Sequence, residues 1–309
     1  MNTVYFEASD GDADRRKRLF DGQLYVYTAR KSILAFARFA RQMIEDAFRG
    51  LDPELAQYSM PVDRYAEILT ELKPKFIHHA ESKRHVRAIL EELGCDLEKT
   101  YFEVPKLRSS TSDGYLTAGI AYAWHPHRDT WYSAPSCQVN WWLPVFDLAS
   151  DNAMAFHPRY WSQPVKNSSA GYNYYVWNKR YRGEHIKAFT NKDPRPLPAP
   201  TQEIELTPQL RLICPVGGVI VFSAAQLHSS VPNTSGRTRF SIDFRTVHSD
   251  DLLRSVGAPN VDSACTGTVL HEFRSACSQA ALPDEVLTQY SDGTETEGTL
   301  VFEGNEGRG

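Results

Sequence analysis

The chain has 309 residues, of which 41% are hydrophobic and 23% charged, a mixture typical of globular proteins with one large domain or two small ones. Its formal net charge is −4. A nucleic acid or an anionic membrane is therefore not an expected partner, because both attract strongly basic proteins.

Cellular location can be predicted from three further features. No apolar run approaches the roughly 20 residues of a membrane helix. The first twenty residues carry charges where a signal peptide needs an apolar stretch. The five cysteines are widely spaced and form no C-x-x-C pair, which favours reduced thiols. We therefore expect a cytoplasmic protein.

The first predicted elements follow a basic patch at residues 15–18, which we expect to be a solvated face. Residues 24–27 could form a short edge strand. Residues 32–49 have apolar side chains at helical spacing, which predicts a helix. Ser32 is a suitable N-cap, and Gly50 stands where a glycine commonly ends a helix.

Two more helices are predicted before residue 100. The first runs over 62–73, and Pro74 is expected to stop it, because proline lacks the N–H that a helix interior needs. The second runs over 82–93 and is closed by Gly94. The N-terminal part, about residues 1–99, is therefore predicted to be largely helical.

From residue 100 the pattern changes to short apolar strands separated by Pro and Gly turns. Such strands are typical of a sandwich or jelly roll. Helices followed by strands indicate an α+β fold with the helices packed against one sheet. The predicted strands cover 101–104, 120–124, 136–143, 153–156, 210–214, 219–222 and 237–247.

We predict a single domain over residues 1–282, with a strand-rich core over about 100–250 and a C-terminal extension. Residues 158–208 lack a clear period. A loop of this length is either a lid or binding loop, or a surface insertion. Its aromatic residues 172–177 would form the lid over a ring-shaped or polar substrate, or simply pack within the loop. Residues 283–309 are acidic and glycine-rich, which predicts a flexible tail.

Candidate metal ligands begin with the His127-x-Asp129 pair, directly after the predicted strand 120–124. Residues two apart in an extended chain point to the same side, so this pair could chelate one ion. His228 follows the predicted strand 219–222 and could supply a third ligand from a neighbouring strand. Two imidazoles and one carboxylate are the ligand set of non-heme Fe(II) oxygenases. A His-x-Asp pair alone is common by chance, so the prediction of a metal site depends on the sequence around His228.

That context is the stretch 215–241: a Gly turn, an apolar strand, His228, a Pro-Asn turn and then an Arg-x-Ser strand. Together with the pattern His127-x-Asp129-x-x-Tyr132, it resembles the phytanoyl-CoA hydroxylase-like branch of the Fe(II)/2-oxoglutarate-dependent dioxygenases. The resemblance extends more loosely over residues 140–161. The N-terminal helices match only in general character.

The resemblance implies a double-stranded β-helix, a jelly-roll and cupin-like core with the N-terminal helices packed on one sheet. It implies Fe(II) held by His127, Asp129 and His228, with 2-oxoglutarate as cosubstrate and O2 as oxidant. An arginine about ten residues after the distal histidine would pair with the far carboxylate of 2-oxoglutarate, and Arg239 matches it. A planar guanidinium suits bidentate carboxylate binding.

Arg237 is the rival of Arg239 for this role, since strand alternation places both on one face. Arg239 is preferred because Ser241 completes the Arg-x-Ser match. Alternation predicts that the side chains of this strand point to two different faces. Those expected to line the core are Arg239, Ser241, Asp243 and Arg245. Those expected to meet the outer layer are Phe240, Ile242 and Phe244.

Further site residues follow by analogy of position. Gln138 and Asn140 would hydrogen-bond the cosubstrate near the metal. Tyr132, Trp142 and Arg245 are candidates for contact with the substrate. His125, two residues before the expected ligand, is assigned a supporting or surface role instead.

The function that the resemblance implies is hydroxylation of an unactivated C–H bond of a small molecule, with conversion of 2-oxoglutarate to succinate and CO2. Related halogenases lack the carboxylate ligand so that chloride can bind, and the presence of Asp129 therefore argues against halogenation. Desaturation, epimerisation and oxidative cyclisation remain alternatives. A binding protein that has lost turnover is a further alternative, because folds are reused.

Overall fold

The computed structural model describes residues 3–117, 125–182 and 196–291. The predicted strand 120–124 lies outside these residues, as do the last residues of the predicted tail. Within the described part the chain forms a mixed α/β fold with seven α-helices and eleven β-strands. No helix of the described part combines the length and the apolar character needed to cross a membrane.

Most strands belong to one large sheet. Its order is β1-β2-β8-β5-β10-β3-β11, with β4 also paired to β10. Among the described strands, β1 and β2 pair in parallel and the other pairs are antiparallel. The bounds are β1 Val4–Phe6, β2 Leu24–Tyr27, β3 Thr100–Phe102, β4 Lys106–Ser110, β5 Val139–Pro144, β8 Val219–Ser223, β10 Arg239–His248 and β11 Arg274–Ser275.

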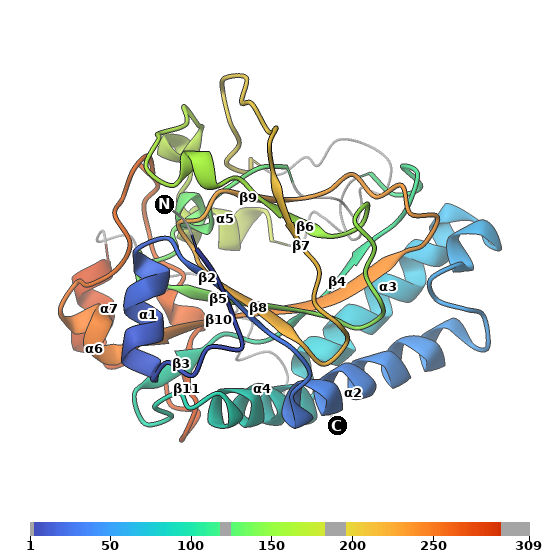
Figure 1. Cartoon of the computed structure of the whole chain (residues 1–309), viewed down its shortest axis with the longest axis horizontal. Helices are drawn as coiled ribbons and strands as arrows, with labels where there is room; N and C mark the ends of the chain where they lie inside the picture. Colours follow the sequence, from blue (N-terminus) through green and yellow to red (C-terminus); the bar gives the residue numbers. More distant parts are fainter. Residues whose placement is uncertain (1–2, 118–124, 183–195, 292–309) are drawn as a thin grey trace.

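A second, three-stranded sheet lies over one face of the large sheet (Figure 1). Its order is β7-β6-β9, formed by Leu210–Leu212, Met154–Phe156 and His228–Ser230. The two sheets meet through apolar side chains, and the rings of Phe156 and Phe222 are 5.0 Å apart. A cavity between the sheets is lined by residues of both, among them His228 of β9 and Trp142 of β5.

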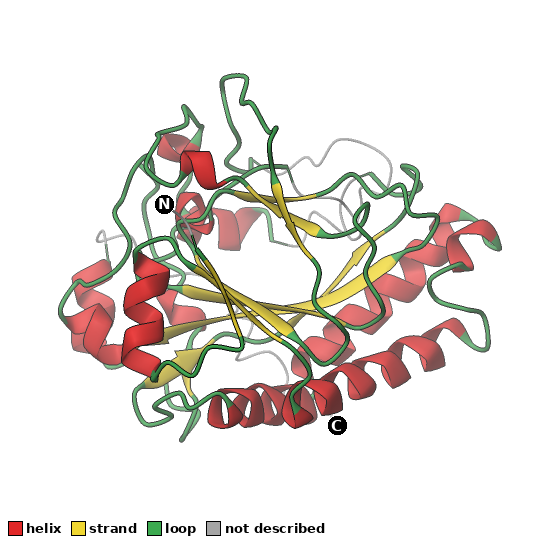
Figure 2. Cartoon of the chain, viewed as in Figure 1, coloured by secondary structure: helices red, strands yellow, loops and turns green. Residues whose placement is uncertain are grey.

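Helices cover the opposite face of the large sheet, as Figure 2 shows for α2, α3 and α4. The outward-facing residues of β10, including Phe240 and Phe244, join the core with these helices. This agrees with the predicted strand alternation. The helices are α1 Asp12–Phe20, α2 Lys31–Phe48, α3 Val62–His78, α4 Ala80–Glu92, α5 Tyr174–Arg180, α6 Ser249–Leu253 and α7 Asp284–Tyr290.

Two predicted boundaries are wrong. Residues 24–27 do not form an edge strand, because β2 pairs with β1 on one side and with β8 on the other. Pro74 does not stop α3, which continues to His78. The turn beyond Pro74 is held by the fully buried Phe76, whose ring stacks on Phe36 at 5.6 Å. Tertiary packing thus outweighs the cost of proline in the helix.

The predicted N-cap of the first long helix is also wrong. The N-cap of α2 is Arg30, and Ser32 lies within the first turn. The free N–H groups of Lys31 and Ser32 instead donate to the carboxylate of Glu92, at 3.1 and 2.8 Å. A side chain at the end of α4 therefore caps α2, and an anion is favourable at this end of the helix dipole.

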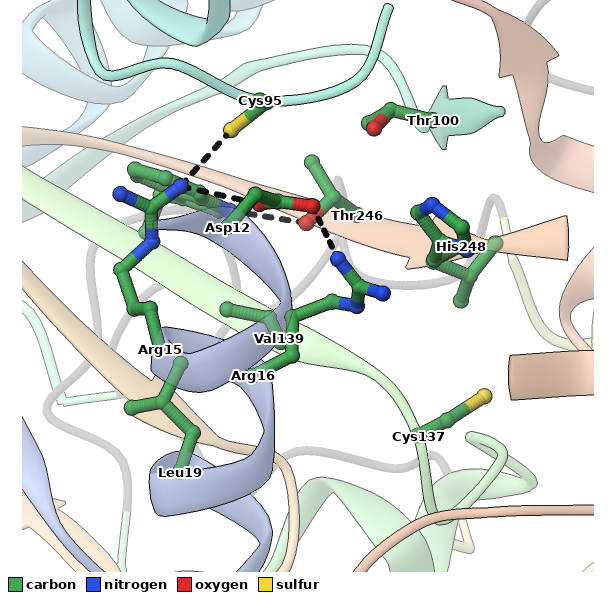
Figure 3. A pocket seen from close by; sticks show the side chains of 12 residues that line it. Asp12, Arg15, Arg16, Leu19, Cys95, Thr100, Cys137, Val139, Thr246 and His248 are labelled. Carbon is green, nitrogen blue, oxygen red and sulfur yellow. Dashed lines mark hydrogen bonds and ion pairs between the residues drawn. The ribbon is translucent and has the colours of Figure 1, made fainter. Parts of the chain in front are cut away.

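The basic patch at residues 15–18 is not a uniformly solvated face. It belongs to α1, and the Arg15 side chain is buried beside a cavity of about 10 Å³ (Figure 3). Its guanidinium donates to the Leu93 carbonyl at 2.8 Å and pairs with Asp12 at 2.9 Å. A space of this size holds about one water. The contact of the Arg15 guanidinium with the Leu93 carbonyl fastens α1 to the end of α4.

We expect Arg15→Met to lower the free energy of unfolding by about 3 kcal/mol, because it leaves the buried Leu93 carbonyl without its donor and breaks a buried ion pair. The matched control is Arg18→Met, whose side chain is 40% exposed and whose loss should change stability far less. Urea unfolding of both variants measures the difference. Equal effects would show that Arg15 is no more structural than its exposed neighbour.

Two segments predicted to be irregular contain helices. Within residues 158–208 the chain forms α5, and the Asn173 side chain caps it by accepting from the N–H of Val176 at 3.0 Å. The segment 283–309 begins with α7, which is anchored by the buried Val286. Both helices have seven residues, which is too short for a clear periodic pattern in the sequence.

Candidate metal centre

The candidate metal ligands are brought together by the backbone. His127 and His228 form a two-residue antiparallel bridge, with N–O distances of 3.0 Å in both directions. Asp129 begins a 3-10 helix that ends at Tyr132, and its N–H donates to the Ala224 carbonyl at 2.9 Å. The backbone therefore brings His228 close to His127 and Asp129, although they are about a hundred positions apart in the sequence.

The three side chains converge. His127, Asp129 and His228 are all buried, and each offers a ligand atom within 4.8 Å of the other two. Oδ1 of Asp129 lies 3.4 Å from Nε2 of His127 and 4.0 Å from Nε2 of His228. This is a two-histidine, one-carboxylate arrangement of the kind that binds a single transition metal.

Backbone carbonyls fix the state of both imidazoles. Nδ1 of His127 lies 2.8 Å from the His125 carbonyl oxygen, and Nδ1 of His228 lies 3.0 Å from that of Gln226. A carbonyl only accepts hydrogen bonds, so each Nδ1 donates to it and each Nε2 is the ring atom that faces Asp129. Burial and the neighbouring His127 lower the pKa of His228 to about 3. His228 is therefore neutral near pH 7, as a metal ligand must be.

Asp129 is held as a carboxylate with one oxygen committed. Its Oδ2 accepts from Asn140 Nδ2 at 2.9 Å, and from Arg245 Nε and Gln138 Nε2 at 3.3 and 3.4 Å. Burial alone would raise the pKa of Asp129, but the charge of Arg245 lowers it well below its usual value. Oδ1 is the oxygen that remains directed at the imidazoles.

Gln138 and Asn140 therefore act on Asp129 in this structure. Gln138 also donates to Asn140 Oδ1 at 3.0 Å, so the two amides form one network. Both were predicted to hydrogen-bond the cosubstrate, and both do line the cavity. Their observed hydrogen bonds place them behind the candidate ligand.

Arg239 is buried on β10, on the cavity side of the strand. Its Nη1 donates to the Asn152 carbonyl at 2.9 Å, its Nη2 donates to Ser230 Oγ at 3.2 Å, and its guanidinium lies over the Trp142 ring. Burial lowers the pKa of Arg239 to about 10, so the side chain keeps its charge at neutral pH.

Two buried polar atoms on this strand lack a partner within the described residues. They are Nε of Arg239, which lines the cavity, and Oγ of Ser241, two residues further along β10. An unsatisfied buried donor costs about 1–3 kcal/mol, so the free Nε of Arg239 favours a ligand that can accept from it. The rival Arg237 is excluded from this role, because its side chain is 53% exposed and pairs with Glu54 at 3.4 Å.

One cavity of about 480 Å³ joins these groups, a size typical of sites for small molecules. The three residues predicted to contact a substrate, Tyr132, Trp142 and Arg245, all line it. Tyr132 packs edge-on against His127 at 5.5 Å and donates from its hydroxyl to the Pro198 carbonyl at 2.9 Å. Nε2 of His125 points away from the ligand set, to the same carbonyl oxygen at 3.0 Å.

Two groups of lining residues extend the predicted site. The first comprises Tyr172, Tyr174 and Trp177. They belong to the segment for which a lid and simple loop packing were both left open, and the structure places them at the cavity. The second comprises Lys73, Lys106 and Arg108, and sequence reasoning missed it. Alternation within residues 106–110 could have revealed β4, but the charged side chains hid it among surface segments.

Comparison with known proteins gives only distant similarity. No family model and no curated protein sequence matches the chain. Among solved structures, the epimerase SnoN with Fe3+, alpha ketoglutarate and nogalamycin RO is 13% identical with a TM-score of 0.38, covering 77% of this chain and 85% of its own. The non-heme monooxygenase ThoJ is 14% identical with a TM-score of 0.36, covering 83% and 86%.

A third solved structure, EvdO2 from Micromonospora carbonacea var. aurantiaca complexed with 2-oxoglutarate, is 13% identical with a TM-score of 0.34, and covers 53% of this chain and 59% of its own. All three TM-scores are below 0.5, so the function proposed below rests on the residues of this chain. Those residues define a buried candidate site for one metal ion, ligated by two histidines and one aspartate.

Proposed function

We propose that this protein is a non-heme Fe(II)/2-oxoglutarate-dependent oxygenase that hydroxylates an unactivated C–H bond of a small molecule. The observation that supports it most is the buried convergence of His127, Asp129 and His228 in one cavity with Arg239. The two facing sheets would then be a double-stranded β-helix within a single domain over residues 1–282.

The donor set fits iron. Two neutral imidazoles and one carboxylate suit Fe(II), and ligands from one side leave positions open on the other. When bound, iron with 2-oxoglutarate and O2 supplies the oxidising chemistry, and 2-oxoglutarate leaves as succinate and CO2. The task of the chain is to hold Nε2 of both histidines and Oδ1 of Asp129 ready. The hydrogen bonds to Nδ1 and Oδ2 described above do this.

The groups around Arg239 fit the far carboxylate of 2-oxoglutarate. That carboxylate would accept from the unpartnered Nε of Arg239 and Oγ of Ser241. Hydrogen bonds between a guanidinium and a carboxylate are charge-assisted and directional. The Trp142 ring packs against the guanidinium, with its centroid 5.6 Å from Cζ, and would keep it in position.

The aromatic residues next to the ligand set would exclude water from the reacting carbon. Tyr132 covers His127, and Tyr172 packs on Tyr132 at 5.6 Å. Asp129 occupies the carboxylate position, which argues against halogenation. Desaturation, epimerisation and oxidative cyclisation use the same site, and the mass of the product distinguishes them from hydroxylation.

The test is release of succinate from 2-oxoglutarate by purified protein with Fe(II), ascorbate and O2, measured by mass spectrometry. We expect succinate above that of a control with EDTA, and more of it when a polar metabolite library includes the substrate. Succinate at the level of the EDTA control under all conditions would contradict the proposal. It would favour a binding protein without turnover.

We expect Asn140→Leu to weaken metal binding about tenfold, because Asp129 loses its shortest side-chain hydrogen bond and partners of metal ligands typically contribute this much. Titration calorimetry with Mn(II) measures the dissociation constant without turnover. The matched control is Asn260→Leu, an exposed residue outside the cavity lining whose amide bonds Ser263 in a surface turn. An unchanged affinity in Asn140→Leu would show that Asp129 needs no such support.

A further inference from the structure

The cavity carries an excess of positive charge. Its described lining contains six cationic and four carboxylate side chains, although the whole chain has a net charge of −4. The proposed Fe(II) and the 2-oxoglutarate dianion would cancel each other, so the excess would remain. The cationic residues are Lys73, Lys106, Arg108, Arg182, Arg239 and Arg245, and the carboxylates are Glu103, Asp129, Asp243 and Glu272.

Part of this charge forms a basic wall, which we define as Lys73 of α3 with Lys106 and Arg108 of β4. Register fixes the two β4 residues, because Lys106 lies opposite Asp243 and Arg108 opposite Ser241 on β10. Both point to the cavity side of the sheet, the side on which Arg239 lies.

An ion-pair network connects the basic wall to the candidate metal ligand. Arg108 pairs with Asp243 at 2.5 Å, and Asp243 pairs with Arg245 at 2.9 Å. Arg245 in turn donates to Asp129 Oδ2 at 3.3 Å. Lys106 pairs with Glu103 at 2.9 Å, and Glu103 with Arg245 at 2.6 Å. The wall is therefore a fixed surface rather than a set of mobile side chains.

Lys73 is where an added anion would gain most. Burial and, next, the charge of Arg108 lower the pKa of Lys73 to about 7, and Asp243 offsets this only in part. Its ammonium group is thus held in a poorly solvated place beside another cation. A carboxylate or phosphate that binds both Lys73 and Arg108 would accept charge-assisted hydrogen bonds from two cations of the lining.

A second part of the cavity lining is an aromatic wall, which we define as Tyr132, Tyr172, Tyr174 and Trp177. It starts at His127, against which Tyr132 packs, and continues through Tyr172. The rings of Tyr174 and Trp177 stack at 6.4 Å. Such rings favour a flat or apolar ligand body. The candidate metal ligands are therefore connected to both walls, to the aromatic wall through His127 and to the basic wall through Asp129 and Arg245.

We propose that the substrate is an amphiphilic acid. Its apolar, ring-containing body would lie on the aromatic wall, and its carboxylate or phosphate would bind Lys73 and Arg108 of the basic wall. A molecule that spans both walls passes the candidate metal ligands with the carbon skeleton between its two ends. The oxidation of that skeleton rests on the proposed function, whereas the binding preference does not.

Three naphthalene probes test the preference, because they share one ring system and differ in one group. They are 1-naphthoate, 1-naphthyl phosphate and the neutral 1-naphthalenemethanol, each titrated calorimetrically into the full chain without added iron or 2-oxoglutarate. We expect at least one acid to bind about tenfold more tightly than the alcohol, as one charge-assisted hydrogen bond allows. The better acid shows whether the group is a carboxylate or a phosphate.

Lys73→Met should abolish the preference for the acid, and Lys73→Arg should retain it because the charge is kept. The matched control is Lys75→Met on the same helix, whose side chain is 70% exposed and pairs with Glu71. It should leave the preference unchanged. Trp177→Ala should weaken the binding of all three probes by the same factor. Thermal unfolding confirms that each variant is folded.

Equal affinities of the three probes, including failure of all of them to bind, would overturn the proposal. So would a preference that survives Lys73→Met, or one that Lys73→Arg also removes. Because the titration requires no turnover, its result is independent of the succinate assay. Succinate release without a preference for acids would leave the oxygenase proposal standing and reject the acidic substrate.

Discussion

In the His127→Ala variant, turnover of 2-oxoglutarate is expected to fall by at least about 100-fold. Loss of a residue that merely supports a metal ligand already costs about 10- to 100-fold, and this change removes a ligand itself. The substitution leaves the backbone bridge to His228 available, since main-chain atoms form it. Succinate formation and Mn(II) titration measure activity and metal affinity separately.

The matched control is His125→Ala, two residues earlier. Its ring contacts the Pro198 carbonyl and lies edge-on to the His127 ring at 6.1 Å, whereas its main-chain carbonyl, which the variant keeps, accepts from Nδ1 of His127. We expect this variant to bind metal with nearly the affinity of the unchanged protein. Equal loss of metal affinity in both variants would mean that the segment matters only for folding, and that His127 is not a ligand.

The second large effect is expected from Arg239→Met, which should raise the KM for 2-oxoglutarate by about 10- to 100-fold. Hydrogen bonds to charged groups contribute about 1.5–3 kcal/mol, and each 1.4 kcal/mol is a factor of ten. Metal affinity should stay nearly unchanged, because the observed contacts of Arg239 are with Asn152, Ser230 and Trp142 and not with the ligand set.

Arg237→Met is the control for this prediction. It removes the same charge two residues earlier, where the side chain is 53% exposed and pairs with Glu54. Its KM for 2-oxoglutarate should stay within about twofold of the unchanged protein, since a surface substitution of this kind costs at most about 0.5 kcal/mol. A KM that rises equally in both variants would assign the effect to net charge. A KM that rises only in Arg237→Met would give Arg237 the cosubstrate role.

The sequence predicts the centre of the site well because that centre depends on local geometry. His127 and Asp129 are two residues apart, and strand alternation separates Arg239 from Phe240 without any knowledge of partners. The assignment of His228 to the same site required a longer pattern, a strand followed by a histidine and a turn. The structure brings these residues together as predicted.

The errors share a different cause, which is contact between residues far apart in the chain. Glu92 caps α2 from another helix, and Phe76 stabilises α3 beyond its proline by packing on α2. Arg15 is buried by the end of α4. In each case local propensity was read correctly, and a distant partner outweighed it.

The walls of the cavity were harder still to predict. The basic wall combines one helix with β4, in which the charged Lys106 and Arg108 alternate with Leu107 and Ser109 over only five residues. It becomes recognisable only through the register of β4 with β10. Two of the four residues of the aromatic wall, Tyr174 and Trp177, lie on a seven-residue helix. What positions a substrate therefore depends on pairing and packing that spacing along the chain does not encode.

The most direct test of the oxygenase proposal is a visible absorption spectrum of the purified protein with Fe(II) and 2-oxoglutarate in the absence of oxygen. Chelation of iron by 2-oxoglutarate at a two-histidine, one-carboxylate site is expected to give a charge-transfer band that neither component gives alone. His127→Ala should abolish the band. A spectrum without the band, unchanged by His127→Ala, would contradict the proposal.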